Sequence, residues 1–216
     1  MTLPPFVPDL ATLLQFAIAT FVIAITPGPD MTLFVGRALA QGRAAGLACM
    51  AGAMTGIVIH TTLVALGLSA LIVASPEAFF ALKIFGAGYL VFLAVQAIRH
   101  GSAFSPERAA RGRRSLAKNW LTGLGINLMN PKIILFFMTF LPQFVSASDP
   151  HAVGKLFFLG LSFIVVSLPV TVPMVLAADG FAGLLKKSPK VTRVVDFLFA
   201  GIFSAFALRI LSAQAR

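Results

Sequence analysis

Two proline-containing interruptions lie inside apolar runs of this 216-residue chain. The first is Ile25-Thr26-Pro27-Gly28-Pro29-Asp30, and the second, about a hundred residues later, is Asn130-Pro131-Lys132. Proline removes a backbone donor and clashes with the preceding turn, at a cost of roughly 3 kcal/mol in a helix interior. We therefore expect a helix to break at each position. Interrupted spans in corresponding halves of a membrane protein are a pointer to a substrate site.

The composition indicates that these runs cross a membrane. The chain is 58% hydrophobic and 11% charged, with a mean hydropathy of +0.94, which is outside the range of soluble domains. The net charge of +10 does not indicate nucleic acid, because the basic residues lie between the apolar runs. Residues 1–15 contain no Lys or Arg, so they lack the basic region of a cleavable signal peptide, and we expect the first helix to be retained.

A bilayer core of about 30 Å needs about 20 apolar residues per helix. On this measure the sequence predicts an all-α, polytopic protein with six transmembrane spans, at approximately 10–39, 46–74, 77–98, 119–142, 153–180 and 194–212. The first span, unbroken, would be about 45 Å long at about 1.5 Å per residue, which exceeds the bilayer core. A break at Pro27 to Pro29 resolves this excess length.

The basic residues predict the orientation. Twelve of the seventeen Lys and Arg residues lie between spans one and two, three and four, or five and six. Such loops face the cytoplasm, so both termini are expected in the periplasm. The loop at residues 99–118 is the one linker within a single transmembrane domain, 1–216. A lipid- or phosphate-binding role for its arginines is the alternative to simple anchoring.

The linker separates two blocks of three helices, 10–98 and 119–212. Because three is odd, the second block enters the membrane in the opposite orientation, so the blocks are predicted to be inverted repeats. Residues 29–35 align with residues 131–137, and the two prolines Pro29 and Pro131 lie ten residues before Leu39 and eleven after Trp120. Both breaks are thus predicted about 15 Å from the inner face, near the midplane.

Each break has the pattern of a helix start. Asn130 precedes Pro131 as an N-cap precedes a proline at the first helical position, and Thr26-Pro27 or Gly28-Pro29 can begin a helix in the same way. Free N–H groups and the positive end of the helix dipole favour an anion there, and a substrate carboxylate is the expected one.

Asp30 and Lys132 each place a charge at the membrane centre, which costs roughly 2.5–3.5 kcal/mol on insertion scales. The charge of Lys132 also opposes the dipole of the helix that it begins. We expect Lys132 to add to a carboxylate site, and Asp30 to bind a substrate ammonium or to titrate during proton exchange. The alternative is a static Asp30–Lys132 pair that joins the two repeats.

Three further polar residues are candidates. His60 is a possible proton relay or a hydrogen-bonded packing histidine. Asn127 contacts substrate or makes a hydrogen bond between helices, and Tyr89 is a candidate for the cavity wall. The predicted substrate-binding residues are Thr26, Pro27, Gly28, Pro29, Asp30, Tyr89, Asn127, Asn130, Pro131 and Lys132. The proton-coupling candidates are Asp30 and His60.

Taken together, these stretches resemble the LysE/RhtB family of amino-acid exporters. The resemblance rests on residues 25–30, on residues 82–90 (Leu-Lys-Ile-Phe-Gly-Ala-Gly-Tyr-Leu), and on Asn130-Pro131-Lys132 followed by residues 135–137. It implies a bacterial inner-membrane protein that exports amino acids such as threonine, homoserine, leucine or lysine, driven by protons and acting as a homodimer. Family members commonly carry Asn at the position of Asp30, so a proton role for this residue would not extend to the whole family.

Other classes of function fit less well. The chain has no His-Glu-x-x-His motif and no serine–histidine nucleophile pattern, so an enzyme is not expected. A single cysteine, Cys49, and scattered histidines disfavour a metal site or metal export. No cofactor is expected. The expected partners are a small amino acid, protons and the bilayer, without nucleic acid; a passive channel and an exporter of another substrate remain alternatives.

Overall fold

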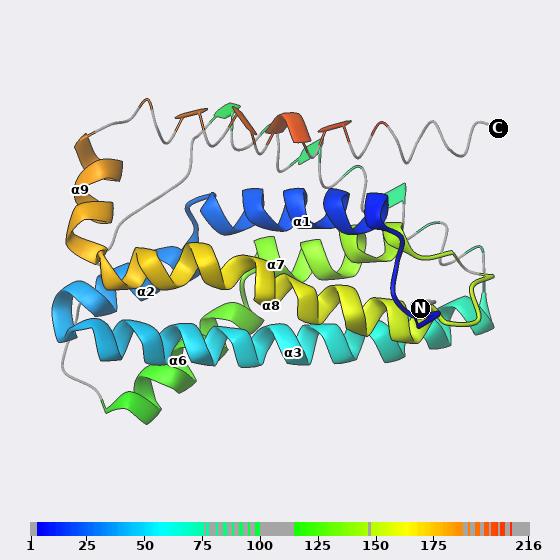
Figure 1. Ribbon diagram of the computed structural model, residues 1–216, viewed down its shortest axis with the longest axis horizontal. Coiled ribbons are helices and arrows are strands. Elements are labelled where there is room, and N and C mark those ends of the chain that lie inside the picture. Colours follow the sequence, from blue (N-terminus) through cyan, green and yellow to red (C-terminus); the bar gives the residue numbers. More distant parts are fainter. Residues whose placement is uncertain are drawn as a thin grey trace.

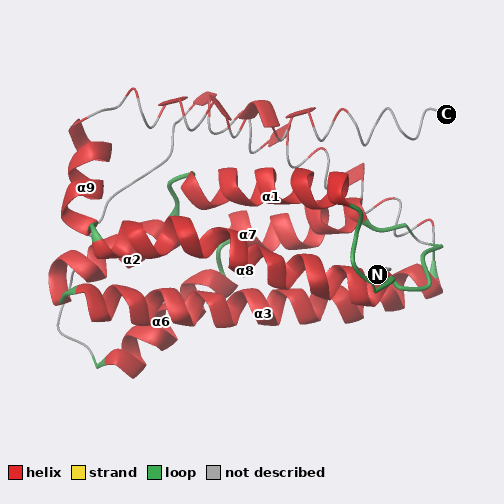
Figure 2. Cartoon of the chain, viewed as in Figure 1, coloured by secondary structure: helices red, strands yellow, loops and turns green. Residues whose placement is uncertain are grey.

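The computed structural model describes residues 4–75, 115–146 and 148–187, with isolated residues between 77 and 99 and between 190 and 208. Within these residues the chain is helical, with turns and loops and without strands (Figures 1 and 2). The helices are α1 (Leu10–Ile25), α2 (Pro29–Gln41), α3 (Arg43–Ala74), α6 (Leu116–Leu128), α7 (Pro131–Leu135), α8 (Ala152–Leu176) and α9 (Ala178–Lys187). A π-helical turn, η1 (Phe136–Phe140), and a 3-10 turn, η2 (Leu141–Phe144), continue α7.

The helices form four apolar segments long enough to cross a membrane. Helices α3 and α8 are each long enough alone. Helices α1 and α2 form a third segment bent by 51°, and α6 with Pro131–Phe144 forms a fourth bent by 52°. The predicted breaks in the first and fourth spans are therefore present. The predicted spans 77–98 and 194–212 lie largely outside the described residues, and the six-helix count stays a prediction.

Capping side chains begin α1 and α6. The Asp9 carboxylate accepts a hydrogen bond from Thr12 N (2.9 Å) at the start of α1. The Ser115 hydroxyl accepts from Lys118 N (3.3 Å) at the start of α6. Each cap satisfies a backbone donor that the first turn leaves without an intrahelical partner. Helix α1 therefore begins after its Asp9 cap and ends at the bend at residues 26–28.

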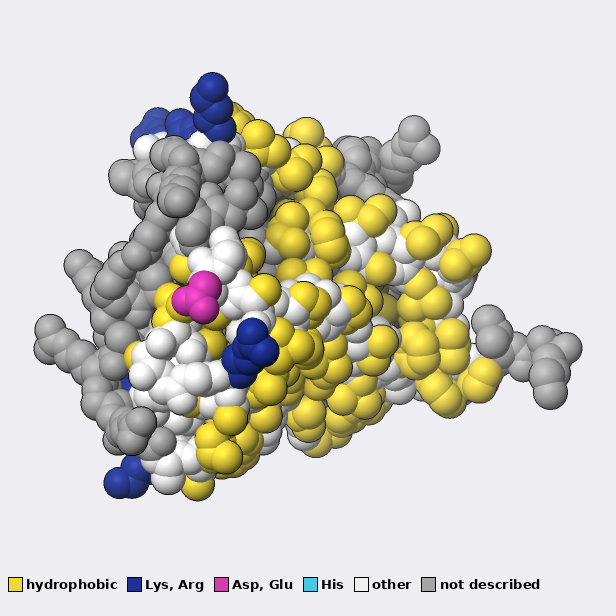
Figure 3. All heavy atoms as spheres, turned by 60° about the vertical axis from the view of Figure 1, so that its left-hand side comes forward, with side chains coloured by type: hydrophobic (Ala, Val, Ile, Leu, Met, Phe, Trp, Pro, Cys, Tyr) yellow, Lys and Arg dark blue, Asp and Glu magenta, His cyan; other side chains and the backbone are white. Residues whose placement is uncertain are grey.

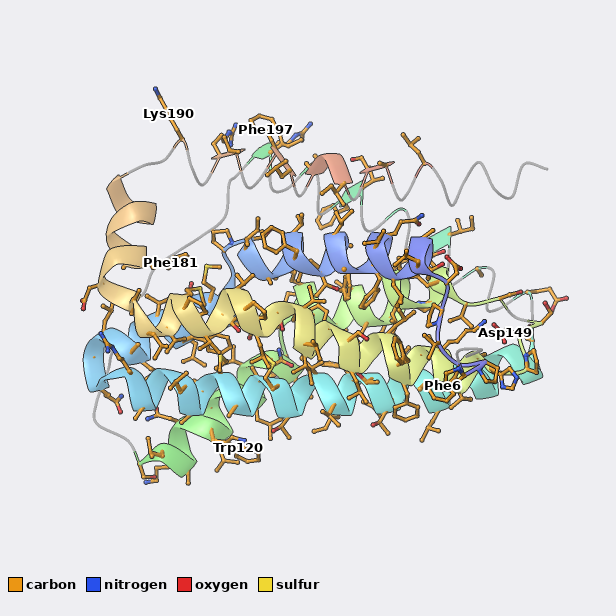
Figure 4. The ribbon with its side chains drawn as sticks, viewed as in Figure 1. Phe6, Trp120, Asp149, Phe181, Lys190 and Phe197 are labelled. Carbon is orange, nitrogen blue, oxygen red and sulfur yellow. The ribbon has the colours of Figure 1, made fainter. Side chains whose placement is uncertain are left out.

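The surface separates apolar flanks from charged ends. Hydrophobic side chains cover the flank of the molecule, whereas the visible Lys, Arg, Asp and Glu side chains gather toward the end where α9 lies (Figure 3). Asp149 lies at the opposite end (Figure 4), where Lys155 donates to its carboxylate. This hydrogen bond, with a second from His151 N, lowers the pKa of Asp149 below its usual range. The arrangement is that of a multi-pass membrane protein.

Two buried clusters form the interior. An aromatic cluster includes Phe16, Phe136, Phe137, Phe140, Leu156 and Phe163 from α1, η1 and α8. Its rings pack closely, with centroids 4.9 Å apart for Phe136 and Phe140. A methionine cluster includes Met31, Phe34, Cys49, Met50, Met174 and Val175 from α2, α3 and α8. Both clusters contribute side chains to the cavity between them.

Helices α3 and α6 pack with their backbones in contact. A Cβ atom at Gly52 would overlap the carbonyl of Trp120, and one at Gly123 would overlap the carbonyl of Cys49. Glycine at both positions therefore permits this approach. The close contact brings the C-terminal end of α6, which carries Asn127, against the middle of α3.

Candidate substrate site

The first break ends α1 and starts α2 within three residues. The hydroxyl and the backbone N–H of Thr26 both donate to Val22 O, at 2.6 and 3.0 Å. Pro27 follows in the non-helical linker. Gly28 is the N-cap of α2 and Pro29 its first residue, so of the two predicted start points it is Gly28-Pro29 that begins the second half-helix. Asp30 lies in the first turn.

The second break repeats this order of elements. Helix α6 ends at Leu128, Asn130 is the N-cap of α7, and Pro131 is its first residue. The Asn130 side chain accepts a hydrogen bond from Lys132 N (3.1 Å). Asn130 and Pro131 therefore act as the sequence predicted, as a cap followed by proline.

Lys132 joins the two breaks. Its Nζ donates to the carbonyl oxygens of Thr26 (2.9 Å) and Ile23 (3.2 Å). These carbonyls belong to the end of α1, where a cation is favourable. A Cβ at Gly28 would lie 3.1 Å from Nζ, so glycine at this position leaves room for the ammonium. The ammonium of Lys132, whose charge opposes the dipole of α7, therefore lies at the C-terminal end of α1.

Asp30 is held by Asn127 rather than by Lys132. Its Oδ2 accepts a hydrogen bond from Asn127 Nδ2 at 2.8 Å. Its Oδ1 is buried and has no hydrogen-bond partner within the described part of the chain. The ion pair found among the described residues is Lys155–Asp149, so Asp30 and Lys132 do not form the static pair considered above. The two charges lie in one site with separate partners.

The side-chain amide of Asn127 has a neighbouring residue at its oxygen and another at its nitrogen. Asn127 is 1% exposed, and a Cβ at Gly56 of α3 would overlap its Oδ1. The amide oxygen therefore faces Gly56 while the amide nitrogen faces Asp30. His60, one turn further along α3, lies 3.4 Å from the backbone carbonyl of Asn127 and stacks on Phe137. Asn127 thus contacts both proton-coupling candidates, one through its side chain and one through its backbone.

A cavity of about 50 Å³ lies between the breaks. Residues of α1, α2, α3, α6, α7 and α8 line it, and the charged residues in its described lining are Asp30 and Lys132. Pockets that hold small molecules usually measure about 300–1,000 Å³. The cavity therefore has room for a few water molecules but must widen to admit an amino acid.

The structure brings together most of the predicted site residues. Thr26, Asp30, Asn127 and Lys132 line the cavity. Pro27, Gly28, Pro29, Asn130 and Pro131 shape the breaks beside it. His60 lies behind Asn127, outside the lining. Tyr89 falls outside the described residues. Among the described residues, no group of three His, Cys, Asp or Glu side chains is placed to hold a metal ion.

Two polar residues of the described lining were not predicted. Ser167 and Thr171 of α8 face the cavity one turn apart. The available signal was a serine and a threonine at positions i and i+4 around Pro169, inside an otherwise apolar span. Hydroxyl residues are common in membrane helices as local hydrogen-bonding groups, so this spacing alone does not mark a site.

Two bent apolar segments that enclose a charged central cavity define a membrane protein of the transporter class. The family comparison is more specific: residues 21–214 match the model of the LysE type translocator. The chain belongs to this family, which confirms the resemblance found in the sequence.

Relatives extend over most of the chain. A homoserine/homoserine lactone efflux protein of Salmonella typhimurium is 28% identical over 199 residues, which is 92% of this chain and 95% of the relative. A leucine efflux protein of Salmonella choleraesuis is 26% identical over 200 residues, 92% of this chain and 94% of the relative. A membrane protein of Bacillus subtilis is 31% identical over 143 residues, 62% of this chain and 68% of the relative. No solved structure matches the chain significantly.

Proposed function

We propose that this protein exports small amino acids across the bacterial inner membrane. The observation that carries the proposal is the presence of Asp30 and Lys132 in one cavity without a direct ion pair between them. An amino acid at neutral pH carries one ammonium and one carboxylate group. The cavity offers an opposite charge to each of them.

The free hydrogen-bonding capacity fits the same ligand. Oδ1 of Asp30 has no partner among the described residues and can accept from a substrate ammonium. The ammonium of Lys132 has three donors, of which two bind Thr26 O and Ile23 O. The third is available to a substrate carboxylate, beside the first-turn N–H groups of α2. The named relatives are efflux proteins for homoserine and homoserine lactone or for leucine, and homoserine and leucine are small amino acids.

Proton coupling is proposed to occur at Asp30. A carboxylate that binds either a proton or a substrate ammonium, but not both, exchanges one for the other. Asp30 is suited to this because one oxygen is anchored by Asn127 and the other is free. His60 lies beside Asn127 and is the candidate for passing the proton onward. Export is then driven by protons that return to the cytoplasm.

Transport is proposed to proceed by alternating access. The aromatic cluster and the methionine cluster both contribute side chains to the wall of the cavity, and the cavity is small. Opening one cluster at a time would expose the site to one side of the membrane. The similar bends of 51° and 52° at the two breaks support inverted repeats that exchange these roles.

The proposed setting is the inner membrane with both termini in the periplasm. The support is the concentration of Lys and Arg in alternate loops of the sequence. A homodimer is also proposed, on the family resemblance.

The test is counterflow in proteoliposomes that contain the full-length protein. Vesicles are loaded with one unlabelled amino acid, and the entry of labelled amino acids from a panel is measured. We expect counterflow for one or a few small amino acids and none in vesicles with the Lys132→Met variant. Flux that equilibrates without counterflow would indicate a passive channel, and flux of divalent metal ions alone would indicate a different substrate class.

A further inference from the structure

Ser167 and Thr171 have no role in the site as described so far. They lie one turn apart on α8 and line the cavity. Both are buried, with 2% and 7% of their surface exposed. Buried hydroxyl groups that face a cavity are able to contact whatever the cavity holds.

The protons of these hydroxyl groups point away from the cavity. Ser167 Oγ donates to Ile164 O (3.1 Å), and Thr171 Oγ1 donates to Ser167 O (3.0 Å). A hydroxyl has one donor and two acceptor lone pairs. With the donor used within α8, each group offers acceptor capacity to a ligand.

The described lining is therefore rich in acceptors. Thr26 Oγ1 also donates to its own helix, at Val22 O, and Asp30 Oδ1 is an acceptor. One amide N–H of Asn127 is used on Asp30, and Lys132 is the cationic donor in the described lining. A zwitterionic substrate supplies donors for Asp30 through its ammonium. The acceptors on α8 can take a further donor, and a hydroxyl group on the substrate side chain is able to supply it.

We infer that Ser167 and Thr171 form a side-chain subsite that selects amino acids with a side-chain hydroxyl over aliphatic amino acids of the same shape. The inference rests on the proposed function. Phe163 and Met174 lie on the same lined face of α8, on either side of the two hydroxyl residues, and restrict the subsite to short side chains. A second cation from a long basic side chain would find no second carboxylate in the described lining.

The test uses threonine and valine, which have nearly the same shape and differ by a hydroxyl. Proteoliposomes with the full-length protein perform counterflow of labelled threonine, and unlabelled threonine and valine compete. We expect threonine to compete at about a tenfold lower concentration than valine, as for one well-formed hydrogen bond. In a Ser167→Ala/Thr171→Val double variant we expect this ratio to fall to about one, with valine competition unchanged.

Matched controls remove the same kind of local hydrogen bond outside the cavity. Ser162 Oγ donates to Phe158 O (2.7 Å) and Thr62 Oγ1 donates to Val58 O (2.9 Å), and neither residue lines the cavity. The variants Ser162→Ala and Thr62→Val should keep the wild-type ratio. The flux of labelled valine reports whether the double variant is folded and active.

Three results would overturn the inference. These are equal competition by threonine and valine in the wild type, an unchanged ratio in the double variant, and loss of valine flux together with threonine flux in that variant. The last result would show that the hydroxyl groups serve the transport cycle or the fold instead of selection. Absence of counterflow for every amino acid in the wild type would contradict the proposed function itself. This outcome differs from the three results above, so failure of the inference and failure of the proposed function can be told apart.

Discussion

At the scale of single residues, Lys132 links the two helix breaks. It begins α7, yet its ammonium lies on the last carbonyls of α1, at 2.9 Å from Thr26 O and 3.2 Å from Ile23 O. Asp30, which begins α2, is bound instead by Asn127 at the end of α6. The charged residue in the first turn of each second half-helix therefore contacts the C-terminal end of the helix before the other break. This exchange places both charges in the cavity while they remain available to a substrate.

Neutralising the two charges together is expected not to restore transport. Asp30→Asn and Lys132→Met should each lower proton-driven amino-acid uptake at least tenfold, because each removes a group that the substrate or proton needs. The double variant should be no better than either single variant, since the two side chains have separate partners. Lys132→Met should also lower the apparent Tm in detergent more than Asp30→Asn, because hydrogen bonds from a charged group contribute about 1.5–3 kcal/mol each.

The double variant also decides between two readings of the site. Recovery of uptake to near the wild-type rate would mean that Asp30 and Lys132 act as a charge pair during the transport cycle. It would contradict the separate roles assigned here.

Residue-level prediction succeeded where the chemistry was local. The prolines at positions 29 and 131 and the Asn130 cap act within a few residues of the chain, and their roles were predictable. The partner of Lys132 was not, because Ile23 lies 109 positions away and the contact depends on how the helices pack. The sequence showed only that the charge of Lys132 was unfavourable where it stood.

At the scale of the helices, close packing of α3 on α6 positions the site. Gly52 and Gly123 let the two backbones touch, and Gly56, one turn along α3, accommodates the amide of Asn127. The glycine at position 56 is therefore a positioning residue for the Asn127–Asp30 hydrogen bond. Helix ends and breaks were close to prediction, whereas the two hydroxyl residues of α8 that line the cavity were not anticipated, because they lie in a span of high mean hydropathy.

Gly56→Ala should impair transport without loss of the fold. The added methyl group overlaps Asn127 Oδ1, which has to move and so weakens its hydrogen bond to Asp30. We expect counterflow to fall about tenfold, the effect of one lost hydrogen bond to a charged group, and the apparent KM to rise. The measurement is counterflow together with thermal unfolding in detergent.

Gly67→Ala is the matched control on the same helix, because a Cβ at Gly67 meets no atom of the described residues within 4 Å. It should keep wild-type transport and be slightly more stable, since alanine favours a helix over glycine by about 1 kcal/mol. Equal transport by Gly56→Ala and Gly67→Ala would show that Asn127 is not held by Gly56.

At the scale of the whole molecule, the cavity lies between an aromatic cluster and a methionine cluster, and each break borders it. The sequence could predict the membrane class, four of the spans and the position of both breaks, because these depend on apolar length and on proline. It could not predict which side chains line the cavity, because that depends on packing among side chains from distant helices. The predicted third and sixth spans fall largely outside the described residues.

The orientation of the molecule can be tested with single cysteines. Cys49 is the one cysteine of the sequence and is buried, so a Cys49→Ala variant gives a background for labelling. Ser115 and Ser146 are exposed and flank the bent α6 to η2 segment. In intact cells, a membrane-impermeant maleimide should label Ser146→Cys, and should label Ser115→Cys only after permeabilisation. The reverse pattern would contradict periplasmic termini.

The most direct test of proton-driven amino-acid export is uptake of a labelled amino acid into proteoliposomes that are acidic inside, with wild type and Asp30→Asn compared. We predict that the wild type accumulates the amino acid above its external concentration and that a protonophore abolishes this. Asp30→Asn should lose accumulation but retain counterflow with a raised KM. Uptake by the wild type that never exceeds equilibrium, or accumulation by Asp30→Asn equal to that of the wild type, would contradict the account.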